Sequence, residues 1–214
     1  GFITTVAGTG VLGSSGDGGP AIRAQVFWPY ALALGPEGSI FFSDPNNNRI
    51  RRIGPDGIIT SFAGKNGPWE IRDGQTAVET FVASPLGLAF GPDRSLTFAE
   101  GGQERIRRVG ADGIVTTVAG NGTRGWGNPL YFGDGGPAAQ GGLEDPMSVA
   151  YGSDGSLYIA DSMDRAIRRV SPAFPGFSSG EVSIPARDGS EVYVFDQGRH
   201  VRTLNALNGT VTYR

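Results

Sequence analysis

The segment ITTVAG at residues 3–8 returns as ITSFAG at residues 59–64 and as VTTVAG at residues 115–120, and both intervals are 56 residues. The stretch SDPNNNRIRRI (43–53) keeps the same interval to AEGGQERIRRV (99–109). Self-similarity at a fixed period of this size is typical of solenoids and propellers. The chain is therefore built from copies of one structural unit.

A third copy is present with two changes. ADSMDRAIRRV (160–170) lies 61 residues after its counterpart, so this copy is preceded by five extra residues, which fall after Gly120. The third copy also lacks a counterpart of VTTVAG and continues into a segment with Pro and Ser at residues 171–180.

Each copy reads as four short strands. In the first copy these are YALALG (30–35), SIFFSD (39–44), NRIRRIG (48–54) and IITSFAG (58–64), which alternate or are rich in β-branched and aromatic residues. The Asp-Gly pair at residues 56–57 favours a tight hairpin between the last two strands. Four antiparallel strands without a helical pattern are the unit of a β-propeller blade.

We therefore predict an all-β protein containing a partial propeller. Small isolated sheets bury too little surface to be stable, so the blades are expected to stack side by side. The propeller part is expected to cover residues 1–170, with residues 1–8 as the last strand of an upstream blade and blades at about residues 30–64, 86–120 and 147–170.

The C-terminal part is predicted to be a linker and then a short β-meander. Residues 171–187 are assigned to the linker. Within residues 188–214, three alternating segments are joined by turns, namely SEVYVFD, RHVRTLN and TVTYR. An alternative interpretation is that residues 188–205 imitate a further blade.

Composition excludes several kinds of site. The chain has no Cys, hence no disulfide, thiol nucleophile or thiolate metal site, and its only histidine is His200. The net charge of −3 argues against nucleic acid and against an acidic membrane surface as the main partner. We expect no direct membrane contact, no catalytic residue, no cofactor and no dedicated metal site.

Three glycine-rich loops raise the question of a ligand. SSGDGGPA (14–21) and FGDGGPA (132–138) are near copies, and RDGQTA (72–77) is a weaker one. A phosphate loop would lead into a helix, and a calcium loop would supply several oxygen ligands, whereas these loops offer single carboxylates such as Asp17 and Asp134. We interpret them as structural turns, with weak Ca²⁺ binding left open.

Two further positions recur in every copy, one acidic and one an arginine. Converging carboxylates are compatible with acid–base or metal chemistry, but an acid and an arginine repeated in each blade are more simply a hydrogen-bonded pair that fixes neighbouring hairpins. The residues are Asp44, Glu100 and Asp161 at the acidic position and Arg51, Arg107 and Arg168 at the basic one.

Aromatic residues in the connections between copies are candidates for partner binding. Exposed aromatics on loops of a rigid scaffold are typical of protein or glycan recognition. The alternative is that they cover the gap between neighbouring blades. The candidates are Trp69, Trp126, Tyr131 and Phe132.

Specific motifs resemble a known family. ALALGPEGSIFFSDPNNNRIRRIGPDG (31–57) and PMSVAYGSDGSLYIADSMDRAIRRV (146–170) resemble NHL repeats, and the ITTVAG and GDGGPA pairs between them resemble the propeller of teneurins and of bacterial RHS (YD-repeat) proteins. Residues 175–214 resemble the segment in which those proteins pass into the YD shell. Glu100-Gly101-Gly102 and the DGQTA loop depart from the family pattern.

The resemblance implies a non-catalytic protein-interaction and scaffold module. It implies part of a larger secreted or cell-surface protein, of bacterial origin, in which the propeller recognises a partner or caps the YD shell. The expected partners are the rest of the parent chain and either another protein or a second copy. The alternatives are a metal-dependent propeller lyase or hydrolase, and a structural subunit that self-associates through exposed blade edges.

Overall fold

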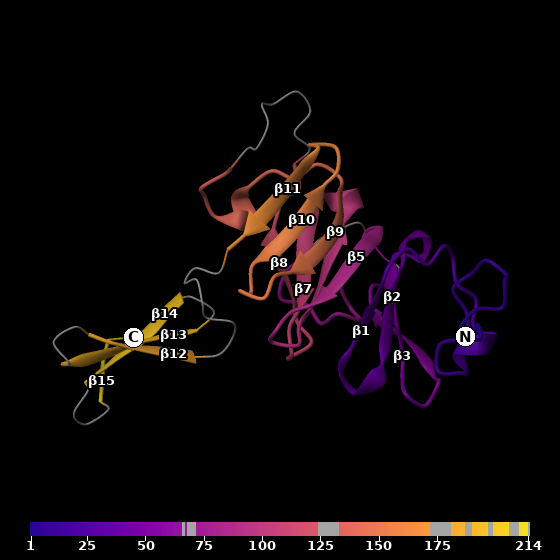
Figure 1. Cartoon of the computed structure of the whole chain (residues 1–214), viewed down its shortest axis with the longest axis horizontal. Coiled ribbons are helices and arrows are strands. Elements are labelled where there is room, and N and C mark those ends of the chain that lie inside the picture. The colour runs from indigo at the N-terminus through magenta and orange to yellow at the C-terminus, as the bar shows by residue number, and fades with distance from the viewer. Residues whose placement is uncertain are drawn as a thin grey trace.

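The protein is all-β and is built from propeller-type blades. The computed structural model describes residues 1–65, 67, 72–123, 133–171, 181–186, 190–196, 199–205 and 210–213. Within these residues the chain forms four consecutive antiparallel sheets and short 3₁₀ turns, with no α-helix. Figure 1 shows three sheets stacked side by side and the fourth apart from them.

The first three sheets are meanders, in which each strand pairs with the next in the chain. Blade 1 consists of β1 (Leu32–Leu34), β2 (Ile40–Asp44), β3 (Arg49–Ile53) and β4 (Ile59–Ala63). Blade 2 consists of β5 (Pro85–Phe90), β6 (Leu96–Glu100), β7 (Arg105–Val109) and β8 (Val115–Ala119). Blade 3 has three strands, β9 (Pro146–Tyr151), β10 (Leu157–Asp161) and β11 (Ala166–Val170).

Turn chemistry explains where the last hairpin of a blade reverses. Asp56 Oδ1 accepts the backbone N–H of Ile58 at 3.1 Å, and Gly57 has a φ of +75°, a conformation that glycine adopts without steric cost. The same bond forms in blade 2, where Asp112 accepts the N–H of Ile114 at 3.0 Å.

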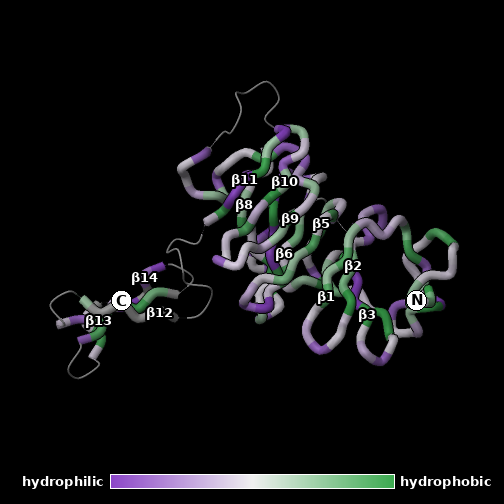
Figure 2. Tube along the Cα trace, viewed as in Figure 1, coloured by the Kyte–Doolittle hydropathy of each residue, from purple (hydrophilic) through white to green (hydrophobic). Residues whose placement is uncertain are grey.

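Apolar side chains fill the space between neighbouring blades. Figure 2 shows apolar residues gathered along the stacked strands. The layer between blades 1 and 2 contains Ile50 and Phe98, both fully buried, and the layer between blades 2 and 3 contains Ile106 and Ile159. Each such side chain contributes about 1.5–3 kcal/mol by leaving water, so blade stacking is the main source of stability.

A leading loop precedes each blade, at residues 9–29, 65–84 and 121–145. In blade 1 this loop lies along the outer edge of β4, because Gly18 donates its N–H to Ile59 O at 2.8 Å and Ile59 donates to Gly19 O at 3.0 Å. Equivalent bonds join the second loop to β8 at Val115. The leading loop therefore serves as an extra edge that protects the fourth strand.

A residue with positive φ lies at the end of each leading loop, and in the second and third loops it bonds to the previous blade. Trp28, Ser84 and Asp145 have φ values of +54°, +46° and +51°, and each precedes a proline. Ser84 donates its N–H to Asn48 Oδ1 of blade 1 at 2.9 Å, and Asp145 donates to Glu104 of blade 2. Successive blades are thus joined by hydrogen bonds as well as by apolar packing.

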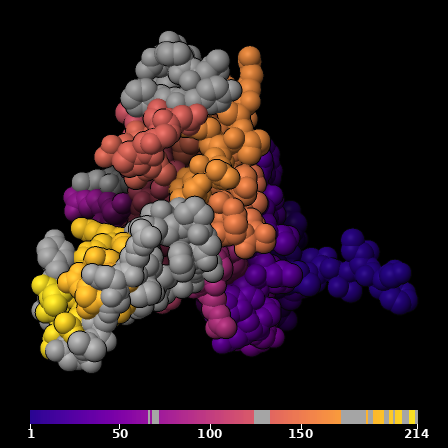
Figure 3. Space-filling view, turned by 60° about the vertical axis from the view of Figure 1, so that its left-hand side comes forward, coloured from indigo at the N-terminus to yellow at the C-terminus, as the bar shows by residue number. Residues whose placement is uncertain are grey.

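One prediction about the chain termini was wrong, and another stays a prediction. Residues 1–8, predicted as the last strand of an upstream blade, pair with no strand among the described residues, and Ile3 is 100% exposed. Figure 3 shows the N-terminal residues projecting from the blades. The predicted linker 171–187 contains a strand, β12 (Glu181–Pro185), whose short alternation of Val182 and Ile184 was hidden beside the Pro, Ser and Gly of the preceding segment.

Strand β12 makes the C-terminal sheet four-stranded rather than three-stranded. Its partners are β13 (Glu191–Asp196), β14 (Arg199–Asn205) and β15 (Val211–Tyr213), paired in chain order.

Candidate functional site

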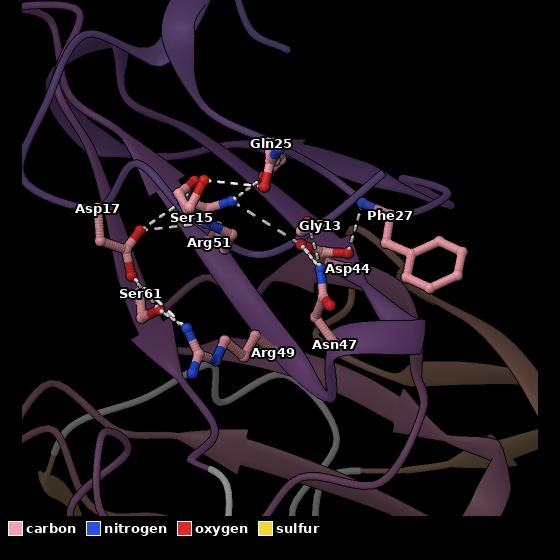
Figure 4. A network of polar contacts seen from close by, with 10 residues as sticks. All are labelled: Gly13, Ser15, Asp17, Gln25, Phe27, Asp44, Asn47, Arg49, Arg51 and Ser61. Carbon is pink, nitrogen blue, oxygen red and sulfur yellow. Dashed lines mark hydrogen bonds and ion pairs between the residues drawn. The ribbon is translucent and has the colours of Figure 1, made fainter. Parts of the chain in front are cut away.

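The repeated arginine of blade 1 holds the leading loop against its blade. The Arg51 side chain, on β3, is fully buried. Its guanidinium donates to Gln25 O at 2.7 Å, to Asp17 Oδ1 at 2.7 Å and to Ser15 O at 3.3 Å (Figure 4). Because the guanidinium reaches both ends of the glycine-rich turn, this turn cannot lift away from β3 without exposing a buried charge.

The repeated acid of blade 1 lies on the other side of the same arginine. Asp44, at the end of β2, is fully buried and 3.9 Å from Arg51 Nη1. Asp44 accepts the backbone N–H of Phe27 at 3.0 Å and a bond from Asn47 Nδ2 at 2.9 Å (Figure 4). We call the set of leading-loop aspartate, arginine and strand-end acid the clamp.

Blade 2 repeats the clamp. Arg107 donates to Arg72 O at 2.9 Å and to Asp73 at 3.3 Å, and Glu100 Oε2 lies 3.6 Å from Arg107 Nη1. Glu100 Oε1 accepts the backbone N–H of Ala83 at 2.6 Å.

Blade 3 repeats the clamp in a more open form. Arg168 donates to Asp134 at 2.6 Å, to Asp161 at 3.3 Å and to Gly142 O at 3.1 Å. Asp161 accepts the backbone N–H of Glu144 at 2.8 Å. The clamp is therefore a property of the repeat and not of one blade.

The structure brings the predicted acid and arginine together in all three blades, and it adds a partner. Asp17 and Asp134 were interpreted as turn residues, yet each binds the arginine that lies 34 residues later. Sequence analysis did not assign Asp73, which occupies the same place in the weaker loop copy. The constant separation of 34 residues between loop aspartate and arginine was the signal that could have identified it.

Burial raises the pKa of the strand-end acids. Loss of hydration raises the pKa of Glu100 to about 7, against the opposing effect of Arg107 and of the Ala83 N–H. Burial likewise raises the pKa of Asp161 to about 6 and that of Asp44 above its ordinary value. Perturbed acids of this kind are also a mark of catalytic sites, so their accessibility decides between the two interpretations.

Accessibility favours a structural role for the clamp. The side chains of Asp44, Glu100 and Asp161 have no exposed surface. A general acid or a metal ligand must touch its substrate or ion, whereas these carboxylates are enclosed by protein. They accept hydrogen bonds from backbone N–H groups and lie beside arginine, and Asp161 also bonds to Asp164. What the arrangement can do is hold a glycine-rich loop in one conformation.

One groove lies beside the clamp of blade 3. It has a volume of about 660 Å³ and runs between β11 and the third leading loop. Its lining includes the apolar side chains of Leu143, Ile159 and Val170 and the ion pair of Arg168 with Asp134.

The structure describes only some of the remaining candidate residues. Trp69, Trp126, Tyr131 and Phe132, predicted to bind a partner, lie outside the described residues. His200 lies in the C-terminal sheet, where Nε2 is 2.9 Å from Thr203 Oγ1 and the ring centroid is 5.4 Å from that of Phe195.

Comparison with curated proteins finds teneurins. The chain is 31% identical to Teneurin-m of Drosophila melanogaster over 202 residues and 29% identical to mouse Teneurin-3 over 209 residues, with 87% and 89% of this chain covered. It spans only 7% and 8% of the length of those two proteins. No protein-family model matches the chain.

Comparison with solved structures supports the fold. A protein of unknown function from Bacteroides thetaiotaomicron matches with a TM-score of 0.53 and 26% identity, over 62% of this chain and 32% of that one. A gluconolactonase from Xanthomonas campestris matches with a TM-score of 0.50 and 15% identity, over 87% of this chain and 61% of that one. Among the described residues, no helix has the length and apolar character needed to cross a membrane. The chain is a propeller-type protein that is similar to teneurins over most of its length.

Proposed function

We propose that this chain is a non-catalytic propeller module, which mediates protein recognition within a larger cell-surface protein of the teneurin and RHS kind. The observation that carries the proposal is the clamp. The recurring carboxylates are enclosed and bound to arginine and backbone N–H groups, so the charged residues of the repeat stabilise the loops between blades. Similarity to teneurins over most of the chain supports the family context.

The clamp suits a recognition role because it fixes loops at one side of a rigid scaffold. A loop that is already ordered loses little conformational entropy when a partner binds, which favours affinity. The third connection is the longest and carries Trp126, Tyr131 and Phe132, the side-chain types that dominate protein interfaces. We propose that the partner contacts these aromatics, with the rest of the parent chain, including a YD shell, adjoining the blades.

Binding to intact cells tests this proposal. The fluorescently labelled 214-residue chain should bind cells saturably, and binding should disappear after protease treatment of the cell surface. The double variant Trp126→Ala and Tyr131→Ala should weaken binding at least about 10-fold without lowering Tm. The matched control is Val78→Ala, which removes an exposed apolar side chain from the second leading loop and should change neither quantity.

The proposal fails if binding is absent or insensitive to protease. It also fails if the double variant loses stability in proportion to binding, because the aromatics then pack between blades instead of facing a partner.

The enzyme alternative is a metal-dependent lyase or hydrolase, and it makes a different prediction. A tightly held divalent ion stabilises the folded state by mass action, so its removal lowers Tm. We expect the Tm of the chain to be the same in EDTA and in millimolar Ca²⁺ or Mn²⁺. A Tm that rises with either ion would favour the enzyme or a calcium site over the recognition module.

A further inference from the structure

The turn after the second strand of blade 3 carries an acid where blades 1 and 2 carry an amide. The position is Asn47 in blade 1, Gln103 in blade 2 and Asp164 in blade 3. In blade 1, Asn47 Nδ2 donates to Asp44 Oδ2 at 2.9 Å and to Gly13 O of the first leading loop at 2.8 Å. An amide nitrogen carries its hydrogens irrespective of pH, so these two bonds do not depend on protonation.

In blade 3 the corresponding bond joins two carboxyl groups. The side chains of Asp161 and Asp164 are hydrogen-bonded to each other. Ionised carboxylates only accept hydrogen bonds, so this bond requires a proton on one of the two groups. Two carboxyls this close hold one proton between them, because two negative charges in contact repel each other. The shared proton therefore takes the place of the amide hydrogen of blade 1.

Blade 1 balances its carboxylates with two arginines. Arg51 donates to Asp17 at 2.7 Å and lies 3.9 Å from Asp44. Arg49 lies 3.9 Å from Asp17. Burial raises the pKa of Asp44, and the positive charges of both arginines oppose this rise. Two carboxylates and two arginines cancel, so the ionised state of this group is electrically balanced.

Blade 3 has more acid and less base. The counterpart of the second arginine is Ala166, while Asp164 is an additional acid. Among the described residues, the ion pairs of this clamp set Arg168 against Asp134 at 2.6 Å and against Asp161 at 3.3 Å. With all three carboxylates ionised, the group has two negative charges in excess, and one proton on the hydrogen-bonded pair halves this excess.

The other described charged groups on the elements around the pair do not supply the missing positive charge. On the third leading loop, Glu144 adds a further carboxylate, and the Asp145 carboxylate lies against Gly101 of blade 2. On the neighbouring turn of blade 2, Glu104 accepts the N–H of Asp145. Arg165 ends the turn of blade 3 and is exposed, so water and salt screen its charge.

The protonation of the pair follows from this environment. Burial, opposed by a backbone N–H and by Arg168, raises the pKa of Asp161 to about 6, and Asp164 contributes to the rise through its charge and its hydrogen bond. In blade 1 burial also raises the pKa of Asp44, but there the hydrogen bond from Asn47 lowers it. An amide and an acid at one repeat position thus have opposite effects on the neighbouring carboxyl group.

The pair lies where the third leading loop is fastened to its blade. Glu144 donates its N–H to Asp161 Oδ1 at 2.8 Å. The next two residues of the turn bond to the same end of the loop. Met163 donates its N–H to Glu144 O at 3.1 Å, and Ser162 donates to Asp145 O at 3.3 Å. Movement of this turn therefore disturbs the end of the loop.

We propose that Asp161 and Asp164 form a proton-operated latch, in which one shared proton holds the turn at residues 162–165 against residues 144–145 of the third leading loop. When the proton leaves, the two carboxylates repel each other and this end of the loop loosens. The closed state binds the proton more tightly than the open state, in which Asp161 is hydrated and has its ordinary pKa of 3.8. The latch is therefore closed in acid and opens as pH rises through about 6.

Amide hydrogen exchange of the 214-residue chain measures the latch. The protection factor of the Glu144 amide, which corrects for the intrinsic effect of pH on exchange, should fall about 10-fold between about pH 5 and about pH 7.5. The samples contain EDTA, so that no metal ion takes the place of the proton. A Glu144 protection factor that is the same at both pH values overturns the proposal.

Asp164→Asn gives this turn the amide of blade 1. The amide donates without a proton from solution, so the loop should stay fastened at neutral pH and the fall in protection should be less than about 3-fold. Asp154→Asn is the matched control, because it removes a carboxylate from the turn between β9 and β10 and should leave the fall at about 10-fold. An Asp164→Asn variant that keeps the full fall overturns the proposal.

The reciprocal change transfers the latch to blade 1. Asn47→Asp combined with Arg49→Ala gives blade 1 the acid and the charge balance of blade 3. The Phe27 amide, which donates to Asp44 at 3.0 Å, should then lose protection about 10-fold over the same pH range. Asn47→Asp alone should give a smaller loss, because Arg49 remains. A Phe27 amide that does not respond to pH in the double variant contradicts the proposal.

Carboxyl titration detects the shared proton directly. In NMR spectra of the chain with isotope-labelled aspartate, the carboxyl signals of Asp161 and Asp164 should share a step near about pH 6, because coupled groups titrate as a pair. Asp161→Asn should remove this step from the Asp164 signal. A step in this range at only one of the two carboxyls, or at neither, contradicts a shared proton.

Discussion

Blades 2 and 3 carry nearly the same third strand, RIRRV and AIRRV, but the structure treats them differently. Ile106 is buried by the neighbouring blade, whereas Ile167 faces solvent. The Arg107 side chain is fully enclosed, while 12% of the Arg168 side chain is exposed. The burial of a repeat residue is therefore set by its neighbours in the stack, so the same side chain contributes different free energies in different copies.

Among the variants that compare blades 2 and 3, the clamp arginines are expected to give the largest loss of unfolding free energy. Arg107→Ala leaves Glu100 buried without its charge partner, which typically costs about 3–5 kcal/mol. Arg168 is itself 12% exposed and its partner Asp134 is 62% exposed, so water can replace part of the bonds that Arg168→Ala removes, and the cost should be smaller, about 1–2 kcal/mol. Urea unfolding measures both free energies, and equal losses would show that the clamps are equivalent despite their different burial.

Removal of the repeated isoleucine should give the next largest effect. Ile106→Ala creates a cavity between blades 2 and 3 and should lower the unfolding free energy by about 2–5 kcal/mol. Ile167→Ala should change it by less than about 0.5 kcal/mol, because this side chain is 72% exposed. Thermal or urea unfolding of the two variants checks the comparison.

A smaller effect is expected from pH. The pKa of Glu100 is raised from 4.5 to about 7, so the folded state binds more protons than the unfolded state between these values, and its contribution to stability decreases as pH rises through them. For Asp161 the window runs from 3.8 to about 6.

Substitution of each acid separates the two contributions. Glu100→Gln should remove the fall in unfolding free energy between pH 4.5 and about 7. Asp161→Asn should remove the fall in unfolding free energy between pH 3.8 and about 6. Unfolding free energies measured at pH steps report the slopes. A slope that survives Glu100→Gln would assign the titration to another group.

The smallest contrast concerns the loop aspartates. Asp73 accepts the backbone N–H of Thr117 at 2.9 Å and its hydroxyl at 3.0 Å, in addition to Arg107, so Asp73→Asn should cost about 1–2 kcal/mol. Asp134→Asn should cost less than about 1 kcal/mol, because blade 3 offers Asp134 no fourth strand among the described residues. A larger loss of unfolding free energy in Asp134→Asn than in Asp73→Asn would mean that the length of the loop, and not the number of bonds to the aspartate, sets its contribution.

The repeat made most of the fold predictable. Alternating segments and the Asp-Gly turns located the strands of three blades, and the recurring acid and arginine indicated a hydrogen-bonded pair. The clamp itself was only partly predictable, because the contact of Asp17 with Arg51 joins residues that are distant in the sequence.

The strand predicted at residues 1–8, as part of an upstream blade, stays a prediction. A strand is a relation between two segments, and the propensity of ITTVAG cannot supply its partner. The strand at residues 181–185 was overlooked because five residues give a weak periodic signal.

The clamp also divides each connection between blades into two parts with different tolerance to length. The separation from the closing glycine of one copy to the clamp aspartate is 9 at Gly8–Asp17 and at Gly64–Asp73, but 14 at Gly120–Asp134. From that aspartate to the clamp arginine the separation is 34 residues in every copy. The five extra residues of the third connection therefore precede the aspartate and leave the spacing of the clamp unchanged, so we expect insertions at this point to alter the loop and not the blades.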